Sequence, residues 1–380
     1  MSPIAMTPIA ISPIDISPFQ EAVTNRTERL RQLRQTTKIF GWFCTYTPVE
    51  MIHAAGFVPV RVSGGATRIE KANTLVPSFV CPYLRASLVH ALNGRYDYLA
   101  GVITAYTCDA ACGMINIWEE NVPAEFFQTI PLPYHTNAPA TEFFRETMRE
   151  LAEGLTAAGG AVDDSSLARS LDLFGEIRAS LRELYELRYD NRLALSGREF
   201  YTVLEACLCL PPEESLPLMT ALVRSAQEGN TSSRPGIPIL ISGSLIEDMR
   251  IFDAVEKAGG RTAADDLCTG YRFIEPADGS GPTPMDRLID RYQRRFPCPA
   301  RSVVGERTDP IRGLIERSGA RGIVFFFQKF CTPHLADYPA LREDLKTSEI
   351  PMLLVEMEET GINEGQLTTR LEGFFEMIGA

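Results

Sequence analysis

The sequence lacks the features that would place it in a membrane, in an export pathway or on nucleic acid. No apolar run approaches the ~20 residues that span a bilayer, and residues 1–19 have neither the basic start nor the continuous apolar stretch of a secretory signal. Lys and Arg number 37 against 49 Asp and Glu, and the net charge of −12 argues against a nucleic-acid partner. We therefore predict a cytoplasmic protein without membrane or nucleic-acid partners.

Several common catalytic and nucleotide-binding motifs are also missing. There is no GxGxxG after a strand, no GxxxxGK[ST] and no GxSxG. We therefore do not expect this chain to bind a nucleoside triphosphate itself. The absence of any CxxC pair excludes zinc ribbons and thioredoxin-like redox motifs. Only four histidines occur, and none shows a two-histidine ligand spacing, which makes zinc a weak candidate metal.

Cysteine, in contrast, is plentiful. The chain contains nine cysteines, an odd number at wide and irregular spacing. With no export signal, this pattern does not look like a disulfide framework, and it fits a reducing compartment better. Surplus thiols in such a compartment indicate metal or redox chemistry more often than structural bridges.

Length and residue pattern predict an α/β protein of two or three domains, with 380 residues available. Strands and helices alternate over 38–140 and again over 236–380, whereas 141–235 carries helical periodicity. We predict two flavodoxin- or Rossmann-like parallel-sheet halves with a helical insert between them. Residues 1–37 form an N-terminal arm and leading helix, and the Ser/Thr-Pro-Ile repeats of residues 1–19 predict a disordered or loosely draped arm.

Three cysteines share one local pattern, in which a strand-like run ends near the thiol and a helix-start signal follows. They are Cys44, Cys108 and Cys331. Because the carboxyl ends of parallel strands form the ligand-binding crevice, these thiols could converge on one metal centre. Helix starts also suit anionic thiolates. We expect an iron–sulfur site, and the alternative is three buried cysteines used as small hydrophobic residues.

The helix-start signals themselves make local predictions. The segments 47–50 and 244–247 read as capping boxes, with Glu50 and Glu247 as their acidic members. Asp109 after Cys108 reads as an N-cap, and Thr332-Pro333 after Cys331 reads as a cap followed by proline.

The other cysteines divide into two groups. Cys81, Cys268 and Cys298 stand in motif-like surroundings and could form a second cluster, line the site or pack in the core. Cys112 lies one helical turn beyond Cys108 and is a possible substitute ligand. We expect Cys207 and Cys209 to be structural.

Taken together, these segments resemble the family of 2-hydroxyacyl-CoA dehydratases and benzoyl-CoA reductases. The resemblance covers residues 38–380, and its motifs keep their order and spacing. The matching stretches are CTYTPVE at 44–50, CPYLR at 81–85, TCD at 107–109, DDLCTGYR at 265–272, KFC at 329–331 and GQLTTRLE at 365–372.

The resemblance implies a [4Fe–4S] cluster held by Cys44, Cys108 and Cys331. It also implies a homologous second subunit and a separate ATP-hydrolysing iron–sulfur activator that delivers one electron at low potential. The substrate would be an acyl-CoA thioester, reduced to a ketyl radical anion. In a dehydratase, a lyase, the 2-hydroxyl group then leaves, whereas in a reductase the electrons stay in an aromatic ring.

Two alternatives stay open within and beside this family. One branch, the double-cubane cluster proteins, works as a homodimer that reduces small molecules and uses additional cysteines, for which Cys81, Cys268 and Cys298 are the candidates. A non-catalytic electron-relay or scaffold subunit is the other alternative. As candidate residues outside the thiols, we take Glu50 for an acid–base role, with helix capping as its alternative, and Arg85 for substrate binding, with a solvated helix face as its alternative.

Overall fold

The computed structural model describes residues 14–65, 67–228, 233–358 and 363–379, and the N-terminal Ser/Thr-Pro-Ile repeats up to residue 13 lie outside these ranges. Its eight strands are β1 Ile39–Trp42, β2 Val58–Arg61, β3 Leu99–Ala105, β4 Phe126–Ile130, β5 Ile237–Gly243, β6 Gly260–Asp266, β7 Ile323–Gln328 and β8 Met352–Met357.

Helices alternate with these strands and also fill the stretch between β4 and β5. They are α1 Ser17–Thr24, α2 Arg26–Leu33, α3 Val49–Ala54, the 3-10 helix η1 Glu70–Thr74, α4 Pro82–Leu92, α5 Asp109–Asn121, α6 Ala138–Ala157, α7 Asp164–Tyr189, α8 Gly197–Cys207, α9 Pro212–Glu228, α10 Arg250–Lys257, α11 Tyr271–Ile274, α12 Pro284–Gln293, α13 Thr308–Ser318, α14 Thr332–Lys346 and α15 Glu364–Gly379. In the described ranges, no helix has both the length and the apolar character needed to cross a bilayer.

The strands form two separate four-stranded sheets, with orders β2-β1-β3-β4 and β6-β5-β7-β8. All pairings are parallel. Counted from its own first strand, each sheet has the same order, in which the second strand lies on one side of the first and the third on the other. This confirms the predicted fold of two parallel-sheet halves. The predicted domain boundaries at 37/38, 140/141 and 235/236 stay predictions.

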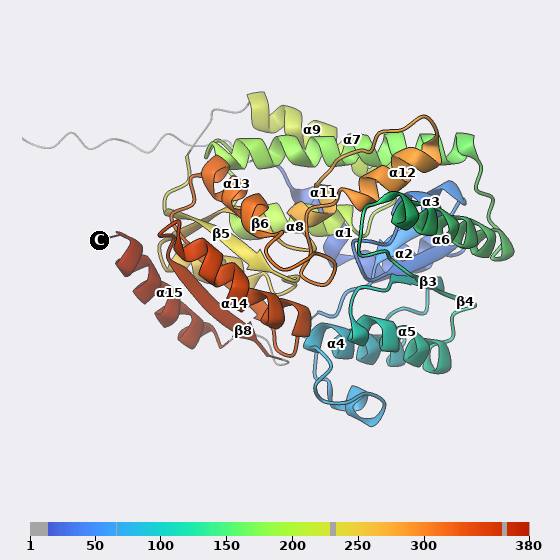
Figure 1. Cartoon of the computed structure of the whole chain (residues 1–380), viewed down its shortest axis with the longest axis horizontal. Helices are drawn as coiled ribbons and strands as arrows, with labels where there is room; N and C mark the ends of the chain where they lie inside the picture. The colour runs from blue at the N-terminus through green and yellow to red at the C-terminus, as the bar shows by residue number, and fades with distance from the viewer. Residues whose placement is uncertain (1–13, 66, 229–232, 359–362, 380) are drawn as a thin grey trace, which may run out of the picture.

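Helix α7 connects the layers of the two halves. It packs against α3 of the first half, against β6 and α12 of the second, and against α9 on its outer side. Figure 1 shows α7 and α9 along one side of the molecule, with α4 and α5 on the opposite side and α14 between them. The long helices of the insert therefore brace the two α/β units, as their position in the sequence suggested.

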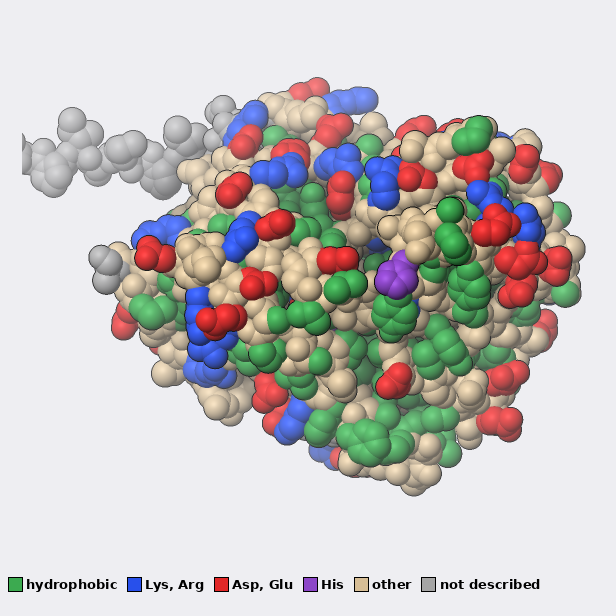
Figure 2. Space-filling view, viewed as in Figure 1, with side chains coloured by type: hydrophobic (Ala, Val, Ile, Leu, Met, Phe, Trp, Pro, Cys, Tyr) green, Lys and Arg blue, Asp and Glu red, His purple; other side chains and the backbone are tan. Residues whose placement is uncertain are grey.

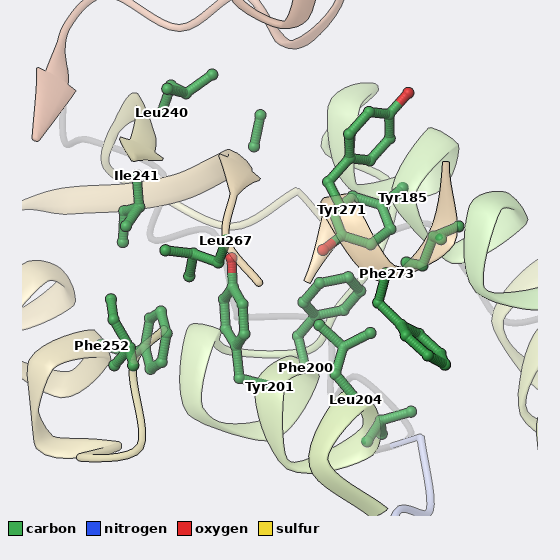
Figure 3. Close-up of a cluster of buried hydrophobic side chains, with 14 of the residues drawn as sticks. Tyr185, Phe200, Tyr201, Leu204, Leu240, Ile241, Phe252, Leu267, Tyr271 and Phe273 are labelled. Atoms are coloured by element: carbon green, nitrogen blue, oxygen red, sulfur yellow. The ribbon is translucent and has the colours of Figure 1, made fainter. Parts of the chain in front are cut away.

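Aromatic residues of the insert pack directly onto the second sheet. Tyr201 from α8 stacks on Phe252 from α10, with ring centroids 4.0 Å apart, and Figure 3 shows both beside Leu267. The hydroxyl groups of Tyr185 and Tyr201 donate to Asp265 Oδ2 at 2.5 and 2.6 Å. The carboxylate at the end of β6 is thus satisfied inside a hydrophobic core, as a buried charge must be.

Two predicted capping boxes are wrong. Glu50 does not cap α3, because its carboxylate pairs with Arg178 from α7 at 2.7 Å. Residues 244–247 do not open a helix, since α10 starts only at Arg250. Glu247 instead accepts hydrogen bonds from the backbone N–H groups of Gly64 and Gly65, at 3.0 and 2.7 Å. In both cases a partner from a distant segment outcompetes the local cap.

The structure also corrects two smaller predictions, one about the start of α5 and one about the N-terminal arm. Cys108 occupies the N-cap position of α5, and Asp109, predicted as the cap, is already helical. The predicted arm extends less far than expected, because α1 begins at Ser17 and buries Phe19 to 2% exposure. Phe19 packs in the core cluster that also contains α7 and α8 residues, so this part of the chain is not loosely draped.

Candidate functional site

Three cysteines stand at the N-cap positions of helices. They are Cys81 before α4, Cys108 before α5 and Cys331 before α14. Proline follows within the first turn of α4 and of α14, where its fixed φ suits helix initiation. None of the three sulfurs makes a capping hydrogen bond of ordinary geometry. The free N–H groups of the first helical turn nevertheless surround each thiol with positive potential.

These three helix starts meet at one pocket. Cys81, Cys108 and Cys331 all line a cavity of about 290 Å³, which thus receives thiols from both halves of the molecule. Phe330, directly before Cys331, lines it too and has a φ of 64°, a left-handed conformation that is rare for a bulky residue. Backbone strain of this kind concentrates at functional sites.

Cys44, Cys268 and Cys298 belong to the same group of thiols. Burial raises the pKa of the Cys44 thiol, and the nearby Cys268 raises it further. Burial also raises the pKa of Cys298 to about 11, where Arg272 acts in the opposite direction and both Cys268 and Cys44 add to the increase. Thiols influence one another in this way only at short range.

The thiols that line the pocket also influence one another's pKa values, and Cys268 and Cys298 influence them too. Burial raises the pKa of Cys331, with Cys81, Cys108 and Cys268 contributing, and burial together with Cys298 raises the pKa of Cys108. The structure therefore brings Cys81, Cys108 and Cys331 to one pocket, while Cys44, Cys268 and Cys298 are linked to them through these effects on the pKa values. At the edge of the group, burial and the nearby Cys108 raise the pKa of Cys112 to about 11.

Two nitrogen donors are aimed at sulfur atoms of this group. Arg272 Nη1 lies 3.2 Å from Cys268 Sγ, and His334 Nδ1 lies 3.3 Å from Cys331 Sγ. Arg272 Nη2 also lies 3.4 Å from His334 Nε2. Because arginine can only donate, Nε2 must accept, and the imidazole proton resides on Nδ1, facing the sulfur. Both sulfurs are therefore hydrogen-bond acceptors, as thiolates and metal-bound thiolates are.

A buried ion network holds Arg272 in place. Its Nη2 donates to the Gly243 carbonyl at 2.7 Å and lies 3.4 Å from Asp266. Arg307 bridges Asp266 and Asp337 at 2.5 Å each. The two arginines and two aspartates are balanced in charge. Burial and these two arginines lower the pKa of His334 well below its usual value, so that the ring stays neutral.

Among the described residues, no group of three or more His, Cys, Asp and Glu side chains is placed to hold one metal ion. The predicted cluster and its predicted ligands Cys44, Cys108 and Cys331 therefore stay predictions.

Comparison with known proteins identifies the family of the chain. The sequence model of the family described as 2-hydroxyglutaryl-CoA dehydratase, D-component, matches residues 44–378. The chain belongs to this family. The resemblance stated from the sequence motifs is thereby confirmed.

Individual members of the dehydratase family match nearly the whole chain. The (R)-phenyllactyl-CoA dehydratase beta subunit of Clostridium sporogenes is 26% identical, over 95% of this chain and 97% of the relative. A benzoyl-CoA reductase subunit of Thauera aromatica is 23% identical, over 87% of each chain. The beta subunit of the (R)-2-hydroxyglutaryl-CoA dehydratase of Acidaminococcus fermentans is 24% identical, over 90% of this chain and 93% of the relative.

The predicted enzyme class is confirmed at the level of the family, whose members are lyases of the 2-hydroxyacyl-CoA dehydratase type. Several relatives are named as beta subunits, which implies a partner subunit in their enzymes.

Glu50 and Arg85 are both buried, at 0% and 1% exposure. Glu50 accepts from Arg178 Nη1 at 2.7 Å and from the Tyr292 hydroxyl at 2.8 Å, so its visible role is to anchor helices α7 and α12. Arg85 donates to the Ser78 carbonyl at 3.1 Å and to the Asn73 side chain. The solvated-face alternative for Arg85 is therefore wrong, while a catalytic Glu50 and a substrate-binding Arg85 stay predictions.

The remaining cysteines lie where the sequence suggested. Cys207 and Cys209 are buried, and Cys207 packs in the large core cluster with α7 and α8 residues. The residues that sequence reasoning missed are Arg272 and His334. For His334 the spacing was a usable signal, because His334 follows Cys331, the N-cap of α14, by three positions, which are neighbouring positions on a helix.

Proposed function

We propose that this chain is the iron–sulfur subunit of a 2-hydroxyacyl-CoA dehydratase or of a related benzoyl-CoA reductase-like enzyme. In this proposal, Cys44, Cys108 and Cys331 hold a [4Fe–4S] cluster. The observation that supports it is the convergence of half-buried thiols from both halves on one pocket, which Cys81, Cys108 and Cys331 line, with Arg272 and His334 directed at the sulfurs of Cys268 and Cys331.

When bound, the cluster would supply one-electron redox chemistry, which a ketyl-radical reaction on an acyl-CoA thioester requires. The chain's own residues would shape its surroundings. Arg272, held by Asp266 and the Gly243 carbonyl, donates toward Cys268, and His334 holds a proton at Nδ1 toward Cys331. Cys298 is buried and Cys44 and Cys268 are half-buried, whereas the pocket lined by Cys81, Cys108 and Cys331 would leave one side accessible.

The partners follow from the same proposal. We infer a homologous second subunit, because the relatives are named as subunits of dehydratases or of a benzoyl-CoA reductase. We also infer an ATP-hydrolysing iron–sulfur activator and an acyl-CoA substrate, and we place the protein in the cytoplasm. All nine cysteines are free in the structure, which suits that compartment.

A second candidate function rests on one specific observation, the inclusion of Cys81, Cys268 and Cys298 in the same group of thiols. Six thiols are enough for two clusters joined as a double cubane. In that case the protein would act as a homodimeric reductase of small molecules.

Iron and acid-labile sulfide per chain, measured on anaerobically purified protein, test both candidates. About four of each supports the single cluster, and about eight or nine supports the double cubane. No iron after anaerobic reconstitution would refute both. A non-catalytic relay subunit would hold iron yet show no acyl-CoA affinity.

Single substitutions then assign the ligands. Cys44→Ala, Cys108→Ala and Cys331→Ala should each abolish iron incorporation, whereas Cys207→Ala is the matched control and should retain it. Cys268→Ala separates the candidates, because the double cubane would lose only part of its iron or rearrange. Full iron in Cys44→Ala, Cys108→Ala or Cys331→Ala would remove that residue from the site.

A further inference from the structure

A second cavity lies next to the pocket that Cys81, Cys108 and Cys331 line, and it is more polar than that pocket. It has a volume of about 170 Å³, many times the ~10–15 Å³ that one water molecule requires on this measure. Arg295 and Arg301 line it, together with Tyr46, Tyr134 and Gln293. Tyr134 and Ser302 also line the thiol pocket, so the two cavities share a wall.

Arg295 is a buried cation with an unused donor. Its side chain is 6% exposed and lies between two aromatic rings, with the guanidinium carbon 5.4 Å from the Tyr46 centroid and 5.3 Å from that of Tyr292. Nη2 donates to the Arg272 backbone carbonyl. Nη1 is buried and makes no hydrogen bond with any described residue. A buried donor without a partner costs free energy, so a ligand that accepts from Nη1 would be stabilised.

The surrounding charges leave Arg295 uncompensated. Arg178 and Arg291 are both fully buried and share one carboxylate, Glu50, at 2.7 and 3.7 Å. Arg295 makes no ion pair with any carboxylate in the described ranges. Two buried arginines thus share one carboxylate and Arg295 pairs with none of the described carboxylates, an excess of positive charge that favours an anion.

Arg301 adds a second cation at the mouth of this cavity. Its guanidinium carbon lies 3.8 Å from the centroid of the Tyr134 ring, and Nη2 donates to the Leu132 carbonyl at 2.5 Å. Gln293 contributes a further donor, because its Nε2 is buried without a partner among the described residues, while Oε1 accepts from Thr141 at 3.1 Å. The acidic lining residue Glu306 is exposed and already accepts from the Val303 N–H at 3.0 Å.

We propose that this cavity binds a small organic carboxylate, held by Arg295 and Arg301 with Gln293 as a further donor. Guanidinium groups match the planar carboxylate in a bidentate manner, and the Tyr46, Tyr134 and Phe144 rings offer apolar surface to the rest of the molecule. No cysteine of the described ranges lines this cavity.

Calorimetric titration of the purified full chain with lactate tests the proposal, with lactamide as the neutral analogue of similar shape. Lactate should bind, and lactamide should bind at least tenfold more weakly, because it lacks the charge. Arg295→Gln and Arg301→Gln should each weaken lactate binding tenfold or more. Arg294→Gln is the matched control, because Arg294 is exposed and pairs with Asp290; it should bind lactate as the unmodified chain does.

Three outcomes would overturn the proposal: no lactate binding, equal binding of lactate and lactamide, or tighter binding of inorganic phosphate than of lactate. If Arg295→Gln does not fold, Arg301→Gln and the comparison with lactamide still test whether the cavity binds a carboxylate. Iron content measured on the same samples keeps the two proposals apart. Lactate binding without iron would refute only the cluster, and iron without lactate binding would refute only the carboxylate site.

Discussion

Glu50 carries a negative charge at a position with no access to water. Burial opposes its ionisation, but Arg178 and Arg291 outweigh burial and hold the pKa of the carboxyl at about 2, below its ordinary value of 4.5. A lowered folded-state pKa means that the stabilisation is fully present above pH 4.5 and is lost as the pH falls toward 2. The shift corresponds to about 3 kcal/mol.

We therefore expect Glu50→Gln to lower the free energy of unfolding by about 3–5 kcal/mol at neutral pH, because it leaves two buried arginines without their carboxylate. The variant should also lose part of the acid sensitivity between pH 4.5 and 2. Urea unfolding at several pH values measures both effects. Glu316→Gln, at an exposed position on α13, serves as the control. A loss below about 1 kcal/mol would show that the ion pair contributes little.

His334 acts on Cys331 through the hydrogen bond from Nδ1 to the sulfur. If the proposed cluster is present, a donor to its sulfur ligand stabilises the more negative reduced state and raises the reduction potential. His334→Phe should therefore lower the potential by about 20–60 mV, the equivalent of one hydrogen bond. An EPR-monitored redox titration gives this value.

The control for that titration is His53→Gln, because His53 pairs with Ser170 and Glu213 rather than with a thiol. Equal potentials in His334→Phe and the unmodified protein would mean that the hydrogen bond to Cys331 does not tune the cluster.

At the scale of helices and strands, Cys44, Cys108, Cys268 and Cys331 are positioned by a repeated unit in which a strand ends, a cysteine follows and a helix begins. This unit could be read from the sequence, since strand-forming runs and Thr-Pro or Asp signals flank the cysteines. Capping was less predictable. Glu50 and Glu247 have the right local spacing for capping boxes, but partners 128 and 183 positions away decide where their carboxylates lie.

Two other elements were predicted only as parts of longer segments. Strand β4 has mostly half-buried residues, so it shows no clear alternation in the sequence. Helix α8 lies in the predicted helical segment 141–235, and its start carries a local signal, because Ser196 and Glu199 form a complete capping box.

Strands β5 and β7 approach each other closely at Gly243, the last residue of β5. A Cβ added there would lie 2.2 Å from the backbone oxygen of Phe326 on the neighbouring strand β7, and backbone cannot move cheaply. Gly243→Ala should therefore lower the free energy of unfolding by about 2–3 kcal/mol. Thermal and urea unfolding measure the loss.

Gly313→Ala is the matched control, because no atom of the described chain lies within 4 Å of a Cβ added at this position of α13. It should stabilise the protein by about 0.5–1 kcal/mol through helix propensity. If the two substitutions gave similar results, the close approach of β5 and β7 would not be a constraint.

At the scale of the whole molecule, the positions of the six cysteines relative to one another depend on how the two halves face each other. Cys44, Cys81 and Cys108 come from the first half, and Cys268, Cys298 and Cys331 from the second. In each sheet the order reverses between the first and third strands, β1 and β3 or β5 and β7, and open α/β sheets bind ligands at such points.

Figure 2 shows apolar side chains across the centre and lower part of the viewed face and acidic ones toward its right-hand edge, over α6.

The sequence predicts each half from local patterns, yet it does not predict how they are joined. The relative placement depends on contacts between residues far apart in the chain, such as Tyr292 donating to the Glu50 carboxylate at 2.8 Å and Glu247 accepting from Gly64. No periodicity or spacing signals such pairs. The second cavity with Arg295 was invisible for the same reason, because its lining comes from segments near 46, 134 and 295.

Glu247 offers a test of whether this joining matters to the thiol site. Its carboxylate accepts from the N–H groups of Gly64 and Gly65, which lie in the loop after β2, so it ties the second half to the first. Glu247→Ala should leave both donors without their partner and lower the free energy of unfolding by about 1–3 kcal/mol. Because the thiols come from both halves, the same variant should retain less iron after reconstitution.

Urea unfolding and iron analysis on the same preparation separate the two effects, with Glu316→Ala as the exposed control. Reduced iron together with reduced stability is expected, since a looser junction would separate Cys268, Cys298 and Cys331 from the cysteines of the first half. Full iron in a clearly destabilised Glu247→Ala would instead mean that contacts nearer to the thiols align them. The contact between Arg272 and His334 is the candidate for that role.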